Sequence, residues 1–164
     1  MRHPILVLLT TLLIASGVAR ADDLVIAKSG QTEATVVVDV NAGVWEKQAA
    51  EDLVHYIELM TESRPKLAAT AGKGPTFFVG SAALTAEPQL QALLDKVAEP
   101  KPLVRADAIV IRRDNSRIYL AGTNDESHYF AVARLLQDWG CRWYMPTEFG
   151  ECIPHHDTLT LGDI

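Results

Sequence analysis

The chain has 164 residues, of which 48% are hydrophobic and 22% are charged. This balance is ordinary for a globular protein and argues against an intrinsically disordered chain. The length is enough for one hydrophobic core. The net charge of −6 argues against nucleic-acid binding, which needs clustered Lys and Arg side chains to displace counterions.

The N-terminal residues have the pattern of a secretory signal peptide. Arg2 precedes an apolar run from Ile5 to Ala15, and Ala19-Arg20-Ala21 supplies small residues at both positions of a cleavage site. The run is too short for a membrane span, which needs about 20 residues. We therefore expect residues 1–21 to be removed, and residues 22–164 to form a single exported domain, periplasmic or extracellular, without a membrane anchor.

The first half of this domain shows strand and helix patterns in alternation. Two β-branched runs at 24–28 and 35–40 flank a turn-like cluster and predict a hairpin. The range 45–61 predicts a helix, and the uninterrupted apolar run 76–80 predicts a central strand. A weaker helical pattern covers 88–97. The expected buried stripe of the helix at 45–61 consists of Trp45, Ala49, Leu53, Ile57 and Met60.

The second half predicts a hairpin, a helix and a tail strand. Alternating apolar residues in 107–113 and 117–122 flank a turn-rich linker. Thr123 and Glu126 have capping-box spacing, and Gly140 is expected to end the helix that they begin. A last short strand is expected at 158–161. The apolar stripe of this helix consists of Tyr129, Val132, Ala133, Leu136 and Trp139.

Together these elements predict an α+β fold. We expect a mixed β-sheet of about five strands with two main helices packed on one face. An α/β arrangement with mixed strand directions is the alternative.

The stretch after Gly140 is an aromatic loop without helical or strand periodicity. A solvent-exposed connection rarely contains so many apolar side chains, which here are Trp143, Tyr144, Pro146 and Phe149. The loop therefore either fills the core of this domain or docks on another surface. Cys141 and Cys152 flank it, and in an exported chain they are a candidate disulfide, with two buried free thiols as the alternative.

Other candidate sites are disfavoured by their composition. The turn from Gly122 to Glu126 lies where a strand meets a helix, but its two carboxylates would repel a phosphate. Cys141, Cys152, His155 and His156 lack the paired spacing of a zinc site. We therefore predict no metal site and no cofactor.

No catalytic constellation stands out either. The acids Asp107, Asp114, Glu148 and Glu151 are interpreted as solvated turn residues, rather than as an acid pair across a sugar cleft. His55 and His128 are expected to be exposed or capping. We predict no catalytic residue in this chain.

Several short motifs, in order, resemble a known domain. They are Ala49-Ala50-Glu51-Asp52-Leu53, Tyr56-Ile57, Met60-Thr61, Phe78-Val79-Gly80, Ile118-Tyr119-Leu120-Ala121-Gly122, Tyr129-Phe130-Ala131-Val132 and Gly140-Cys141-Arg142-Trp143-Tyr144 with Pro146. This set resembles the N-terminal domain of α-glucuronidases, and it is similar to the matching second domain of β-hexosaminidases. Glu62 stands where that family usually has glycine.

The resemblance implies a mixed sheet with two helices on one face, preceding a catalytic (β/α)8 barrel that holds the acid and base. The chain is then expected to be a non-catalytic accessory domain of an exported glycoside hydrolase-like protein, with that barrel as its intramolecular partner. The alternative is a free-standing carbohydrate-binding module that stacks sugars on the loop at 143–149. An autonomous hydrolase is the third and least favoured reading.

Overall fold

The computed structural model describes residues 23–98 and 106–164, so the predicted signal peptide at 1–21 lies outside the described residues. Its helices are α1 (Val44–Thr61), α2 (Ser81–Ala86), α3 (Gln89–Val97), α4 (Asp125–Asp138) and the 3-10 turn η1 (Glu148–Gly150). Its strands are β1 (Leu24–Lys28), β2 (Thr35–Val37), β3 (Lys66–Ala68), β4 (Thr76–Val79), β5 (Ile109–Asp114), β6 (Arg117–Gly122), β7 (Arg142–Trp143), β8 (Glu151–Cys152) and β9 (Thr158–Leu161).

The main sheet is mixed and has five strands in the order β3-β2-β4-β6-β5. Strands β3, β2, β4 and β6 run parallel, while β5 pairs antiparallel with β6, as the predicted hairpin requires. All four residues of β4 are buried. An uninterrupted apolar run suits a strand covered on both faces, and β4 lies at the centre as predicted.

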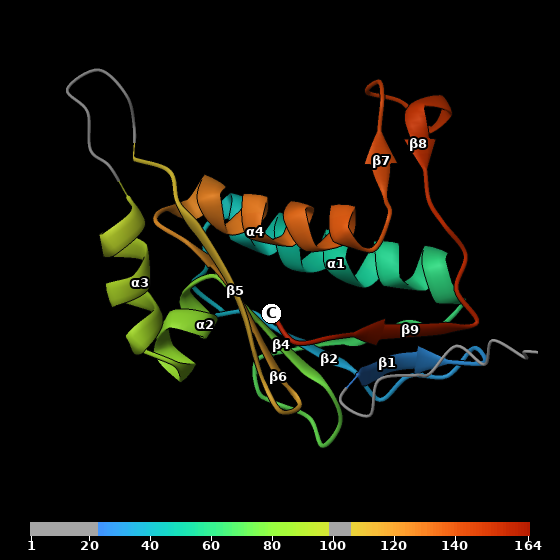
Figure 1. The fold of residues 1–164 in the computed structure, drawn as a ribbon, viewed down its shortest axis with the longest axis horizontal. Coiled ribbons are helices and arrows are strands. Elements are labelled where there is room, and N and C mark those ends of the chain that lie inside the picture. Colours follow the sequence, from blue (N-terminus) through green and yellow to red (C-terminus); the bar gives the residue numbers. More distant parts are fainter. Residues whose placement is uncertain (1–22, 99–105) are drawn as a thin grey trace, which may run out of the picture.

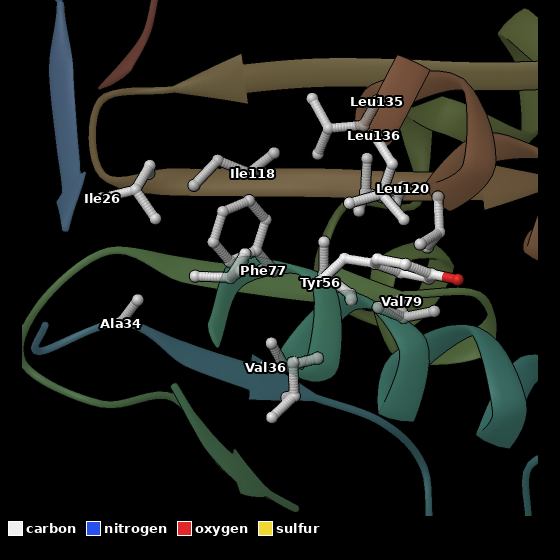
Figure 2. Close-up of a cluster of buried hydrophobic side chains, with 14 of the residues drawn as sticks. Ile26, Ala34, Val36, Tyr56, Phe77, Val79, Ile118, Leu120, Leu135 and Leu136 are labelled. Carbon is white, nitrogen blue, oxygen red and sulfur yellow. The ribbon is translucent and has the colours of Figure 1, made fainter. Parts of the chain in front are cut away.

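The two long helices α1 and α4 pack together on one face of this sheet (Figure 1). Their buried residues meet the side chains of alternate strand positions, such as Val36, Phe77 and Leu120 (Figure 2). The predicted α+β class and the placement of two main helices on one face are confirmed. Trp45 is the exception in the predicted α1 stripe, because it is 47% exposed and packs edge-to-face on Tyr129.

The opposite face of the sheet carries a second, smaller layer. Leu90 and Leu94 of α3 and Ala83 of α2 pack against Phe78 and Tyr119, which point away from α1 and α4. Helix α3 corresponds to the predicted helix at 88–97, whereas α2 was not predicted. The sheet is therefore covered on both sides.

The predicted hairpin between 24–28 and 35–40 is wrong. A tight turn does form at Ser29 and Gly30, both with positive φ, but the pairing ends after the bridge between Lys28 and Gln31. Strand β1 instead pairs antiparallel with the distant tail strand β9. A β-bulge between Val25 and Ala27 allows the consecutive residues Ile26 and Ala27 both to be buried.

Side chains from neighbouring elements cap the helix N-termini at the carboxyl edge of the sheet. Asp125, in the first turn of α4, accepts hydrogen bonds from the backbone N–H groups of Trp45 (3.2 Å) and Glu46 (3.0 Å), and so caps α1. Glu46 in turn accepts from the backbone N–H (2.8 Å) and hydroxyl (2.7 Å) of Ser81 at the start of α2. A Cβ on Gly43 would occupy the space of the Asp125 carboxylate.

The ends of α1 and α4 differ in detail from the predictions. Asn124, not Thr123, is the N-cap of α4, and its side chain accepts from the backbone N–H of Ser127 at 3.0 Å. Gly140 follows the last turn with φ of 100°, as the predicted helix end requires. Glu62 ends α1 in the left-handed conformation, with φ of 58°, at the position where the resembled family usually has glycine. Within the described ranges, no helix has the length and apolar character needed to cross a membrane.

Candidate functional site

The aromatic loop at 143–149 is carried by a short antiparallel ribbon. Strands β7 and β8 pair with Trp143 opposite Glu151, and the backbone N–H of Tyr144 donates to the carbonyl of Gly150 at 2.8 Å. Gly150 lies so close to the Met145 backbone that any Cβ there would clash. The ribbon projects beyond α1 and α4, on the side away from the main sheet (Figure 1).

This loop does not fill the core of the described domain. Phe149 is 95% exposed, Tyr144 is 76% exposed and Met145 is 55% exposed, and Pro146 is also exposed. Contiguous apolar side chains in water are uncommon on a monomeric protein and mark interaction surfaces. The tip of the loop, from Tyr144 to Phe149, therefore lies outside the core, whereas Trp143 at its base is partly buried against it.

Trp143 anchors the ribbon to helix α1. Its indole Nε1–H donates to the hydroxyl of Tyr56 at 2.8 Å, and the two rings meet edge-to-face with centroids 5.2 Å apart. The Tyr56 hydroxyl then donates to Oε1 of Glu151 on β8 at 3.0 Å. These contacts fix the base of the ribbon while its tip stays exposed.

A cleft opens between α1 and α4 beside Trp143, and we call it the helix cleft. At its edge the hydroxyl of Tyr129 donates to Oδ2 of Asp52 at 2.7 Å. A more open groove under the aromatic loop also has Trp143 in its lining, so the two hollows adjoin at this side chain. The helix cleft is lined by Asp52, Tyr56, Tyr129, Val132, Ala133, Leu136 and Trp143.

The tyrosine hydroxyls of the cleft stay protonated at neutral pH. Burial raises the pKa of Tyr56 to about 12, and the Glu151 carboxylate adds to this effect, although the Trp143 hydrogen bond opposes it. Burial and then the hydrogen bond to Asp52 raise the pKa of Tyr129. Both hydroxyls therefore act as hydrogen-bond donors to carboxylates rather than as bases.

A wider, open hollow lies beyond the C-terminal end of α1, between the turn at Ser29 and the residues Glu62 to Arg64. Its lining mixes polar turn residues with small and aliphatic ones, and no aromatic side chain contributes to it. Binding pockets are usually built from apolar and aromatic walls with a few convergent polar groups. The helix cleft and the aromatic loop fit this description better, so we place the candidate site there.

Cys141 and Cys152 are both free thiols in the structure. Arg142 lies opposite Cys152 in the ribbon, and successive side chains of a strand alternate between faces, so the two cysteines project from opposite sides. Cys141 is fully buried beside Met60, with its Sγ 3.7 Å from the Met60 Sδ, whereas Cys152 is exposed. The candidate disulfide is therefore not formed in this arrangement.

His128 is buried, which corrects the prediction that it is exposed or capping. Its Nδ1 accepts a hydrogen bond from the backbone N–H of Gly122 at 2.8 Å, at the end of β6. Burial lowers the pKa of His128, although the carboxylates of Glu46 and Asp125 oppose the shift. His128 is thus a neutral core residue that holds the strand end.

The remaining candidates occupy separate places. His156 contacts the Trp139 carbonyl at 3.3 Å, while His155 faces Asp157 across 3.6 Å. In the part of the chain that the structure describes, no group of three or more His, Cys, Asp or Glu side chains is arranged to hold a metal ion.

Within the described residues, three of the four predicted turn acids accept hydrogen bonds through their carboxylates, and Asp114 accepts its bond from the side chain of the neighbouring Asn115 at 2.9 Å. Asp107 accepts from Asn124 at 2.7 Å and from the Ser127 hydroxyl at 3.0 Å, so it supports the start of α4. Glu151 belongs to the candidate site through its contact with Tyr56.

Asp52, Tyr56, Tyr129 and Glu151 were not predicted as site residues. The signal for Asp52 and Tyr56 is present in the sequence, because residues four apart share one face of a helix. Tyr129 and Glu151 come from other elements, and their meeting with α1 depends on tertiary packing. No protein-family model matches this chain, and a comparison with curated proteins finds no match.

Proposed function

We propose that this chain is a non-catalytic accessory domain of an exported glycoside hydrolase-like protein of the α-glucuronidase type. In this proposal the domain packs against a (β/α)8 catalytic barrel through the aromatic loop at 143–149. The barrel supplies the acid and base, and this domain contributes no catalytic residue, metal or cofactor. The order of motifs that resembles the family supports the assignment.

The exposure of Phe149 and Tyr144 on a fixed ribbon is the observation that carries the proposal. Full burial of a large apolar side chain stabilises an interface by about 1.5–3 kcal/mol. Tyr56 and Trp143 hold the base of the ribbon, so little ordering entropy is lost when a partner covers the tip. A preorganised apolar projection of this kind suits a permanent interface within a larger protein.

Binding of an apolar-surface dye tests whether the loop is an uncovered interface. We expect the folded protein to increase dye fluorescence, and Phe149→Ser and Tyr144→Ser to remove most of that increase. Phe130→Ser is the matched control, because Phe130 is 47% exposed on α4, outside the loop. Circular dichroism confirms that each variant is folded. Equal dye binding by the wild-type protein and the loop variants would argue against a docking loop.

A carbohydrate-binding module is the second candidate, and the helix cleft is the observation that favours it. Tyr56, Tyr129 and Trp143 supply aromatic surface beside two carboxylates, and Tyr144 is exposed next to them. Titration with xylan-derived oligosaccharides, measured by isothermal titration calorimetry, tests this function. A saturable response that Trp143→Ala abolishes would favour the module, and a flat response at millimolar sugar would reject it.

A further inference from the structure

The side-chain donors in the helix cleft are already used inside the protein. The Tyr129 hydroxyl donates to Asp52, the Tyr56 hydroxyl donates to Glu151, and the Trp143 indole donates to Tyr56. What remains toward solvent is acceptor capacity, because each carboxylate oxygen has two lone pairs. An incoming group must therefore donate hydrogen bonds to be satisfied here.

The charged side chains that line the cleft and the adjoining groove are all acidic. Asp52 lines the cleft, Glu151 lies behind Tyr56, and Glu148 lines the adjoining groove under the aromatic loop. No Lys, Arg or His side chain lines either hollow, all of whose lining residues belong to the described part of the chain. A uronate or phosphate group would be repelled, while a cation would be attracted.

The size and the aromatic walls of the cleft favour a guanidinium over an ammonium group. The cavity is ≈ 290 Å³ in volume, which is at the small end of ligand pockets and fits one side chain. Its aromatic walls are Tyr56, Tyr129 and Trp143. A planar guanidinium stacks on aromatic rings and carries five donors that pair with carboxylates, whereas an ammonium offers three donors from a compact, strongly hydrated charge.

We propose that the helix cleft receives an arginine side chain of the protein surface on which this domain docks. The guanidinium lies against Tyr56, Tyr129 and Trp143 and donates to Asp52, while the Glu151 carboxylate behind Tyr56 adds negative charge. This inference rests on the proposed docking function and adds the chemistry that the partner surface must present. The exposed aromatic loop supplies apolar contact area. The cleft fixes how the two protein surfaces align and favours a positively charged group on the partner.

The first test uses NMR to compare two probes whose backbone ends are blocked and uncharged. One is N-acetyl-arginine amide, and the other is its neutral isostere, N-acetyl-citrulline amide. The Trp143 indole N–H is the reporter, assigned through Trp143→Phe. We expect the arginine probe to shift the Trp143 indole signal in a saturable way. The citrulline probe should bind with an affinity about tenfold weaker. Added salt should weaken the binding of the arginine probe and leave the binding of the citrulline probe unchanged.

Variants then locate the interaction. Asp52→Asn and Glu151→Gln keep the shape of each side chain but remove its charge, and each should weaken arginine binding about fivefold. Asp95→Asn is a closely matched control: Asp95 accepts from Gln91 four residues earlier at 2.8 Å, as Asp52 does from Gln48 at 2.8 Å, but it lies on α3. The control should bind arginine like the wild-type protein.

Three results would overturn the inference. These are equal binding of the arginine and citrulline probes, tighter binding of glucuronic acid or glucosamine at the same reporter, and no arginine-dependent shift at millimolar probe. None of them depends on folding of a variant, because all are measured on the wild-type protein. Loss of dye binding in the loop variants would still support docking in that case, so failure of the arginine site and failure of the proposed function are distinguishable.

Discussion

Tyr56 connects the buried core to the candidate site. Its ring belongs to the main hydrophobic cluster, while its hydroxyl joins Trp143 of β7 and Glu151 of β8 (Figure 2 shows the ring within the core). One side chain thus ties the projecting ribbon to α1. The packing of the core therefore determines where the aromatic loop points.

At the same scale, the two thiols are expected to differ in reactivity. Burial raises the pKa of the Cys141 thiol to about 11, and the side chain is inaccessible, whereas Cys152 is exposed. We predict that iodoacetamide modifies one thiol in the folded protein, at Cys152, and both after denaturation, as counted by intact mass spectrometry. Two unreactive thiols under denaturing, non-reducing conditions would instead indicate a disulfide.

His128 makes the stability depend on pH. Because the folded-state pKa is lowered, the unfolded chain takes up a proton first, so this contribution is present above a pH of about 6.5 and is lost as the pH falls through the folded-state pKa. We predict that His128→Gln costs about 1–3 kcal/mol at pH 7, through the unpaired Gly122 N–H, and less at pH 5.

Urea denaturation at both pH values checks this prediction. His55→Gln is the control, because His55 is exposed on α1. An equal cost of His128→Gln at pH 7 and pH 5 would contradict a neutral, buried imidazole.

At the scale of elements, the carboxyl edge of the sheet couples three helices. Asp125 of α4 caps α1, and Glu46 of α1 caps α2, so the starts of α1 and α2 each depend on a side chain from another helix. Negative charge at a helix N-terminus is also favoured by the helix dipole. Asp125, one of the two carboxylates predicted to repel a phosphate, is thus a structural cap.

The layer of α2 and α3 is expected to be integral to the domain. Leu90 is fully buried against the second face of the sheet, whereas Leu93 on the same helix is 44% exposed. We predict that Leu90→Ala lowers the free energy of unfolding by about 2–5 kcal/mol, as core truncations do. Leu93→Ala should cost far less. Similar small effects of both variants in urea denaturation would show that this layer contributes little.

At the scale of the molecule, elements with strong local signals could be predicted from sequence. The uninterrupted apolar run of β4, the helical stripe of α1 and the alternation in β5 and β6 each follow from one stretch of chain. The partner of β1 could not be predicted, because β9 lies at the far end of the chain.

The same distinction applies to the candidate site. Tyr144 and Phe149 could be singled out because apolar side chains are concentrated in one irregular loop, and both are exposed in the structure. The cleft could not, because Asp52, Tyr129 and Glu151 meet only when α1, α4 and β8 pack together. The burial of His128 could not be predicted, because it follows from the packing of α4 against β6.

Photo-crosslinking from the loop tests the central claim most directly. Phe149 is replaced by p-benzoylphenylalanine in the producing cell, and Val44, which is 79% exposed at the start of α1, is replaced in the same way as the control. We predict that position 149 crosslinks to the (β/α)8 barrel of a glycoside hydrolase, on the same or another chain, and that position 44 does not. Crosslinks from position 149 only to other proteins, or equal crosslinking from both positions, would contradict the account.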